Sequence, residues 1–108
     1  MPLEERKVND HKSVINICGL PFTVNELETN ELSGENIGSS CFDMLEINIA
    51  KGLHPEMKQQ TLIHEWIHML LDANAFLKES EDEKLVSVLS NELYRCGFRL
   101  EIEEKLLA

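Results

Sequence analysis

The chain has no apolar run of the length that a membrane-spanning helix needs. Such a helix takes about 20 consecutive apolar residues, and no segment of the 108 residues approaches that length. Residues 1–7, Met-Pro-Leu-Glu-Glu-Arg-Lys, are charged where a secretory signal peptide has an apolar core. These absences argue against an integral membrane protein and predict a protein that stays in the cytoplasm.

Cysteine is too scarce and too irregularly spaced to organise the fold. Cys18, Cys41 and Cys96 are odd in number and form no C-x-x-C pair. This spacing argues against a disulfide framework and against a zinc site built from thiolates. We therefore expect the three cysteines to act as small buried apolar side chains.

Basic residues are half as numerous as acidic ones. Ten lysines and arginines stand against twenty aspartates and glutamates, which gives a formal net charge of −10. Such a charge opposes contact with nucleic acid phosphates and with anionic lipid, so we expect neither nucleic acid nor a membrane as partner. A metal-free acidic protein that imitates nucleic acid is one alternative function, although solubility more commonly explains such a charge.

The composition is that of one folded globular domain. Hydrophobic residues make up 43% of the chain, which is ordinary for a globular protein. A chain of 108 residues has room for one modest core. With no repeat, low-complexity tract or linker to divide the chain, we expect a single domain over residues 1–108, with the charged residues 1–12 frayed.

The most informative feature is the segment His64-Glu65-Trp66-Ile67-His68, an H-E-x-x-H motif. Histidines four residues apart on a helix share one face, with Cβ atoms roughly 5–6 Å apart, so both imidazoles can bind one tetrahedral Zn²⁺. Glu65 lies about 60° around the helix from His68. Its carboxylate can therefore flank the metal and act as general base toward a zinc-activated water, as in H-E-x-x-H metallopeptidases.

The surrounding residues predict a long buried helix from residue 55 to about residue 75. Pro55 suits a first helical position and Glu56 suits the first turn. From residue 57 to residue 71, apolar residues cover most of the helix circumference, which is typical of a buried helix. Histidines and a glutamate in such a place need strong partners to offset desolvation. Hydrogen-bonded structural histidines are the alternative; a metal is the partner that we expect.

Four short segments before this helix are strand-like. They cover residues 13–18, 22–24, 37–42 and 45–49, with a polar loop or short helix expected over residues 25–36. Leu45, Ile47 and Ile49 alternate with polar residues, which indicates a strand with one buried face. We predict an α+β fold in which a small antiparallel sheet of three to four strands packs on the motif helix and on a second, C-terminal helix.

The second helix is predicted to begin after an S-x-x-E capping box, Ser80-Glu81-Asp82-Glu83. Apolar residues follow at helical spacing, and Gly97 suits the end of a helix. Beyond it, residues 98–102 alternate like a strand and residues 103–108 have a helical pattern.

A catalytic zinc site has three protein ligands and an open position for water. The cysteines are poorly placed, so the acidic run over residues 79–83 is the expected source of the third ligand. Glu83 has an alternative role as the last residue of the capping box, where its side chain bonds to the backbone N–H of Ser80. Asp82 is the reserve candidate for the ligand.

The two helices together resemble the gluzincin metallopeptidases and, more narrowly, the small phage-associated proteins of the ImmA/IrrE type. Residues 61–68 and 83–90 carry the resemblance, which extends over about residues 37–94. In that group a glutamate of the second helix completes the zinc site. The resemblance thus implies a minimal zincin-like domain with one Zn²⁺ per chain held by His64, His68 and Glu83. It also makes Ser87, one turn beyond Glu83, a candidate hydrogen-bond partner near the ligands.

The sequence departs from that group in three ways. Ser87 stands where the group usually has asparagine, and no proline follows the second helix. We also expect no counterpart of the extra domain that larger members use to recognise partners. These differences affect substrate and regulation more than metal binding.

The resemblance implies a zinc-dependent peptidase with Glu65 as catalytic base and with a protein or peptide as substrate. An extended substrate would pair with an edge strand at residues 39–42 through main-chain hydrogen bonds. Tyr94, on the same side of the last helix as Glu83, is a candidate donor to an oxyanion, with an ordinary buried tyrosine as the alternative. The alternative function is a zinc-binding, phage-type interaction or regulatory module with little or no proteolytic activity.

Overall fold

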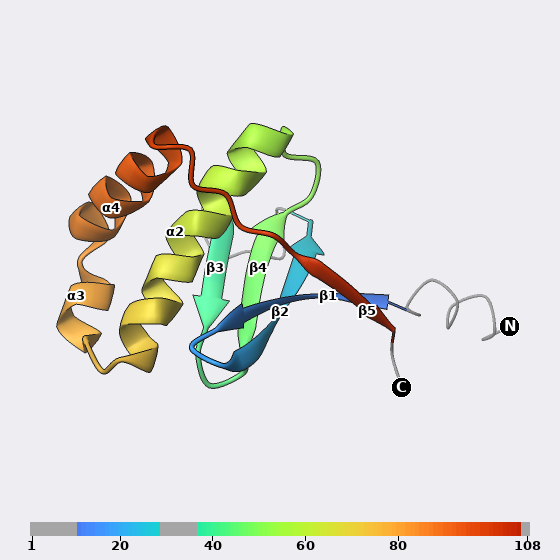
Figure 1. Ribbon diagram of the computed structural model, residues 1–108, viewed down its shortest axis with the longest axis horizontal. Coiled ribbons are helices and arrows are strands. Elements are labelled where there is room, and N and C mark those ends of the chain that lie inside the picture. Colours follow the sequence, from blue (N-terminus) through green and yellow to red (C-terminus); the bar gives the residue numbers. More distant parts are fainter. Residues whose placement is uncertain (1–10, 29–36, 107–108) are drawn as a thin grey trace, which may run out of the picture.

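The computed structural model describes residues 11–28 and 37–106 (Figure 1). Its elements are β1 (His11–Ile17), β2 (Leu20–Leu27), β3 (Gly38–Cys41), β4 (Glu46–Ala50), α2 (Pro55–Ala73), α3 (Leu77–Glu81), α4 (Glu83–Arg95) and β5 (Glu103–Leu106). Helix α2 contacts β1, β3 and β4 on one side and α3 and α4 on the other. The predicted α+β class is therefore confirmed.

The sheet differs from the predicted one in size and direction. It has five strands in the order β3-β4-β2-β1-β5. Strands β2 and β4 pair in parallel, with Val24 opposite Ile47, whereas the other three pairs are antiparallel. The prediction of three to four antiparallel strands is therefore wrong. Alternation of apolar residues determines which face of a strand is buried, but it does not determine which strand lies beside it.

A second difference from the predicted fold concerns the last strand of the chain, β5. Glu103–Leu106 forms β5, which pairs with the edge of β1, although residues 103–108 have a helical pattern; residues 107–108 lie outside the described residues. A short segment cannot stabilise an isolated helix, but it can satisfy the unpaired backbone groups of an edge strand. Residues 98–102, predicted to be strand-like, form no strand. They cross α2, where the Gln59 side chain bonds to the backbone N–H and C=O of Leu100 at 3.0 and 2.8 Å.

Other predicted boundaries hold to within a few residues. The motif helix, expected over residues 55–75, spans Pro55–Ala73. Strand β1 begins at His11, so residues 11–12 are ordered in a strand rather than frayed, and residues 1–10 lie outside the described part. Strand β2 runs to Leu27, beyond the predicted end at residue 24, and residues 29–36 of the predicted loop also lie outside the described part.

The core has two parts, one on each side of α2. Between α2 and the sheet lie the buried residues Ile15, Ile17, Phe22, Val24, Ile47, Ile49, Leu62 and Met69. Between α2 and α4 lie Ile63, Ile67 and Val86. Helix α2 is thus buried on two sides, as its apolar circumference predicts. No helix in residues 11–28 and 37–106 is long and apolar enough to cross a membrane.

The cysteines do not join this core. All three are exposed, so the prediction of buried apolar cysteines is wrong. Each lies where the chain leaves an element: Cys18 follows β1, Cys41 ends β3, and Cys96 caps the C-terminus of α4. Composition alone does not reveal such positions.

Candidate metal centre

Helix α2 carries the motif and is well defined at its start. Pro55 occupies the first turn, and the Nδ1 atom of His54 accepts a hydrogen bond from the backbone N–H of Glu56 at 3.1 Å. This cap satisfies a donor that the first turn of a helix leaves without a partner. His64 and His68 lie further along α2, one helical turn apart, and the centroids of their rings are 5.0 Å apart. Their side chains are 24% and 13% exposed.

Glu83 is the first residue of α4, and Asp82 is the residue that caps this helix. The Asp82 carboxylate accepts a hydrogen bond from the backbone N–H of Leu85 at 3.1 Å. The predicted capping box is therefore wrong, because Ser80 lies within the short helix α3 and α4 begins at Glu83. Since Asp82 makes the cap, the Glu83 side chain is free to turn toward α2.

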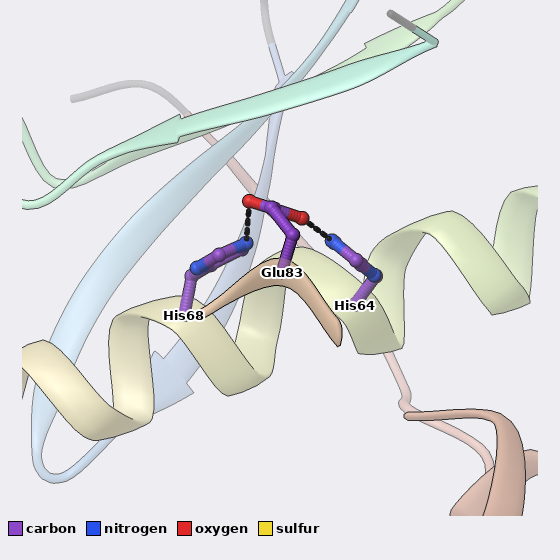
Figure 2. Close-up of side chains that lie close together, drawn as sticks. All are labelled: His64, His68 and Glu83. Atoms are coloured by element: carbon purple, nitrogen blue, oxygen red, sulfur yellow. Dashed lines mark hydrogen bonds and ion pairs between the residues drawn. The ribbon is translucent and has the colours of Figure 1, made fainter. Parts of the chain in front are cut away.

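The structure brings together the three residues predicted as ligands. Glu83 Oε1 lies 3.0 Å from the Nε2 atom of His64, and Glu83 Oε2 lies 3.0 Å from the Nε2 atom of His68 (Figure 2). The potential ligand atoms of the three residues all lie within 4.8 Å of one another. This group of side chains could hold a metal ion.

The three donors are of kinds that metal centres in proteins use. Two imidazole nitrogens and one carboxylate form a donor set found in catalytic zinc sites, with bonds of about 2.0–2.1 Å. A cleft of about 640 Å³ opens beside the group, so solvent has access to it.

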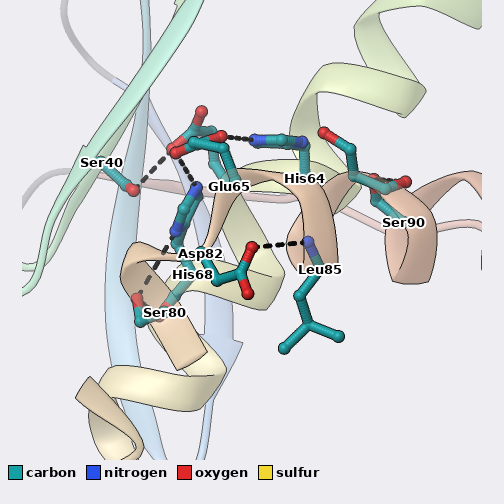
Figure 3. A network of polar contacts seen from close by, with 10 residues as sticks. Ser40, His64, Glu65, His68, Ser80, Asp82, Leu85 and Ser90 are labelled. Atoms are coloured by element: carbon teal, nitrogen blue, oxygen red, sulfur yellow. Dashed lines mark hydrogen bonds and ion pairs between the residues drawn. The ribbon is translucent and has the colours of Figure 1, made fainter. Parts of the chain in front are cut away.

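Glu65 is buried beside these residues and lines the same cleft. It is 7% exposed, and its Oε1 atom accepts a hydrogen bond from the Ser40 hydroxyl at 2.6 Å (Figure 3). This bond offsets part of the cost of removing the carboxylate from water. Ser40 comes from β3, and no motif in the sequence points to it.

Ser80 is a second residue that the sequence does not reveal as part of the site. It is buried, its hydroxyl donates to the backbone C=O of His68 at 3.1 Å, and it lies 3.5 Å from His68 Nδ1. Ser87, the partner implied by the resemblance, has a different contact: its backbone C=O accepts from the Ser90 hydroxyl. Among the described residues, no hydrogen bond joins the Ser87 hydroxyl to His64, His68 or Glu83.

Tyr94 lies outside the cleft. Its hydroxyl donates to the Glu56 carboxylate in the first turn of α2, and the Arg99 guanidinium lies 3.9 Å from its ring centroid. Glu56 is about two turns of helix from His64. These contacts give Tyr94 a role in joining α4 and the C-terminal segment to α2, and they do not support a role as oxyanion donor.

Gly38 allows β3 to approach α2. A Cβ atom added at this position would lie 2.5 Å from Thr61 Cγ2 and 3.4 Å from Glu65 Oε2. The first of these distances is a steric clash, so Gly38→Ala should displace the strand and lower the free energy of unfolding by about 1–3 kcal/mol. Chemical denaturation measures the change.

A second substitution tests this explanation directly. Thr61→Ser removes the Cγ2 methyl group that the new Cβ would meet, so the Gly38→Ala/Thr61→Ser variant should recover most of the lost stability. Equal stability of Gly38→Ala and the wild type would contradict the close approach.

Glu83 and Asp82 can be separated by matched amide substitutions. Glu83→Gln removes a negative charge from the proposed ligand set, so it should weaken zinc binding. Replacing a residue that only hydrogen-bonds to a metal ligand typically lowers metal affinity by about 10–100-fold, and we expect a considerably larger decrease for Glu83→Gln. Asp82→Asn should change affinity little, because asparagine is equally suited to the cap. Competition with a chromophoric chelator measures both affinities. The reverse order would make Asp82 the ligand.

Comparison with known proteins finds no match among protein-family models, curated sequences or solved structures. The resemblance to gluzincin metallopeptidases remains a prediction from residues 61–68 and 83–90. The group formed by His64, His68 and Glu83, with Glu65 beside it, is accordingly the basis for assigning a function.

Proposed function

We propose that this protein is a zinc-dependent metallopeptidase of minimal, zincin-like architecture that hydrolyses peptide bonds. One observation carries the proposal: His64, His68 and Glu83 converge within 4.8 Å beside the buried carboxylate of Glu65, and all four line one open cleft. A metal-binding group with a carboxylate base next to it is the arrangement that metal-assisted hydrolysis requires.

The side chains divide the work between binding and proton transfer. His64, His68 and Glu83 would hold the ion, which would act as a Lewis acid that lowers the pKa of water toward about 7 and polarises a carbonyl group. Glu65 accepts the proton of the attacking water and passes it to the leaving amine. The two roles need separate carboxylates, and the structure has Glu83 facing the imidazoles and Glu65 facing Ser40.

The substrate that suits this cleft is an extended segment of protein or peptide. Strand β3 is an edge strand of the sheet, and Gly38, Ser39 and Ser40 line the cleft. The predicted edge at residues 39–42 thus coincides closely with β3. An edge strand presents unpaired backbone groups that an extended chain can bind. Such pairing depends on the main chain and selects weakly among side chains.

The proposal is tested by peptide hydrolysis with the zinc-loaded protein and with its Glu65→Gln variant. Cleavage by the wild type, lost in a variant that keeps its zinc, supports a peptidase with Glu65 as base. Zinc binding without hydrolysis supports the alternative of an interaction or regulatory module.

A further inference from the structure

The hydrogen bond between Ser40 and Glu65 joins the edge strand to the motif helix. Its length of 2.6 Å lies within the range of about 2.5–3.0 Å for an O–H···O hydrogen bond. Glu65 is 7% exposed, so little water is available to replace this partner. The H-E-x-x-H motif includes Glu65, but it does not predict that Glu65 contacts Ser40 of β3.

We propose that Ser40 is a positioning residue for the general base, an inference that rests on the proposed function. The Ser40 hydroxyl donates a hydrogen bond to Oε1 of Glu65, whereas Oε2 accepts no hydrogen bond from the described residues. One oxygen is therefore held by the protein and the other is left to accept a proton. A glutamate side chain otherwise has substantial rotamer freedom, and Ser40 restricts it to the orientation that faces the cleft.

The backbone of β3 explains why this serine can reach the helix. Alternate residues of a strand point to the same face, so Gly38 and Ser40 both face α2. Gly38 permits the close approach, because a Cβ there would lie 2.5 Å from Thr61 Cγ2. Ser39, between them, faces the other way, and its hydroxyl lies 3.4 Å from the amide nitrogen of Asn48.

The side chain of Ser40 and the main chain of β3 have different proposed roles, and this difference predicts a specific kinetic effect. The Ser40 hydroxyl is already bonded to Glu65, and an extended substrate would use the main chain of the strand. Loss of the hydroxyl should therefore lower kcat and leave KM unchanged. Misplacement of a catalytic group by about 1 Å can cost on the order of 100-fold in rate, so we expect a decrease of about 10–100-fold in kcat for Ser40→Ala.

The kinetic test compares three variants on a fluorogenic peptide that the zinc-loaded wild type cleaves. Ser40→Ala should lower kcat without losing zinc, and Ser40→Thr, which keeps the hydroxyl, should restore most of it. Ser13→Ala is the matched control, because it removes another serine–glutamate bond, 2.7 Å long, between Ser13 of β1 and Glu104 of β5. It should leave kcat unchanged. An unchanged kcat in Ser40→Ala, or an effect confined to KM, would overturn the role of Ser40.

A second test uses the metal-free protein and needs no activity. Thermal unfolding of Ser40→Ala, Glu65→Ala and the double variant forms a double-mutant cycle. Ser40→Ala should lower the melting temperature in the wild type and change it little in the Glu65→Ala background. Additive effects would overturn the inference. If the wild type shows no Glu65-dependent hydrolysis, the proposed function fails, and this cycle still decides whether Ser40 holds Glu65.

Discussion

Replacing either motif histidine by alanine should abolish stoichiometric zinc binding. The purified wild type should hold close to one zinc per chain, because His64, His68 and Glu83 converge from two helices. Removal of one imidazole leaves two protein ligands, fewer than the three of a catalytic zinc site. Elemental analysis by mass spectrometry of His64→Ala, His68→Ala and the wild type measures the stoichiometry.

The same substitutions should remove the stabilisation that zinc confers. A ligand that binds only the folded state stabilises it by about 2.7 kcal/mol at 100 times its dissociation constant. Added zinc should therefore raise the melting temperature of the wild type and leave that of either variant almost unchanged. His54→Asn is the control, because His54 caps α2 outside the motif and asparagine is a favoured N-cap. Full zinc stoichiometry in the His64→Ala/His68→Ala double variant would refute the proposed site.

Glu65→Gln should retain zinc and fold while losing peptide hydrolysis. The amide is nearly isosteric with the carboxylate, and its oxygen can still accept the hydrogen bond from Ser40. It cannot accept a proton from water, and general-base catalysis contributes about 100- to 10,000-fold in rate. Hydrolysis of a peptide library, with zinc content and melting temperature measured on the same samples, separates loss of chemistry from loss of structure.

Glu104→Gln is the matched control for this substitution. Glu104 also accepts a hydrogen bond from a serine hydroxyl, that of Ser13, but it lies on β5 at the opposite edge of the sheet from β3. Its replacement should leave hydrolysis at the wild-type rate. Undiminished activity of Glu65→Gln would exclude Glu65 as the base, whatever the metal content.

Local periodicity accounts for what could be predicted about the fold. The helix over residues 55–75 was predicted from a proline, an acidic first turn and apolar residues around the circumference, and it spans Pro55–Ala73. The alternation in residues 45–49 likewise predicted a buried face, and Ile47 and Ile49 are fully buried. Both patterns depend on the direction of side chains, which repeats every 3.6 residues in a helix and every 2 residues in a strand. These repeats can be read from residues that are close in the sequence.

The residues of α2 alone also predict where the candidate site lies on this helix. A spacing of four residues places His64 and His68 on one helical face wherever the helix lies in the fold, and it places Glu65 beside them. For Glu83 the sequence supports two roles, because the capping pattern over residues 80–83 assigns it a hydrogen bond to the backbone as an alternative to metal binding. In the structure Ser80 lies within α3 and Asp82 caps α4, so Glu83 is not part of a capping box. The packing of α4 against α2 brings Glu83 to the histidines.

The contacts between distant segments depend on how the whole chain packs. The parallel pairing of β2 with β4, the addition of β5 to β1, and the hydrogen bond from Ser40 to Glu65 join residues that are well separated in the chain. Strand pairing depends on which edges remain free after the other strands have paired. A serine in a strand gives no sign of the carboxylate that it will meet, because that meeting depends on the approach of β3 to α2 at Gly38.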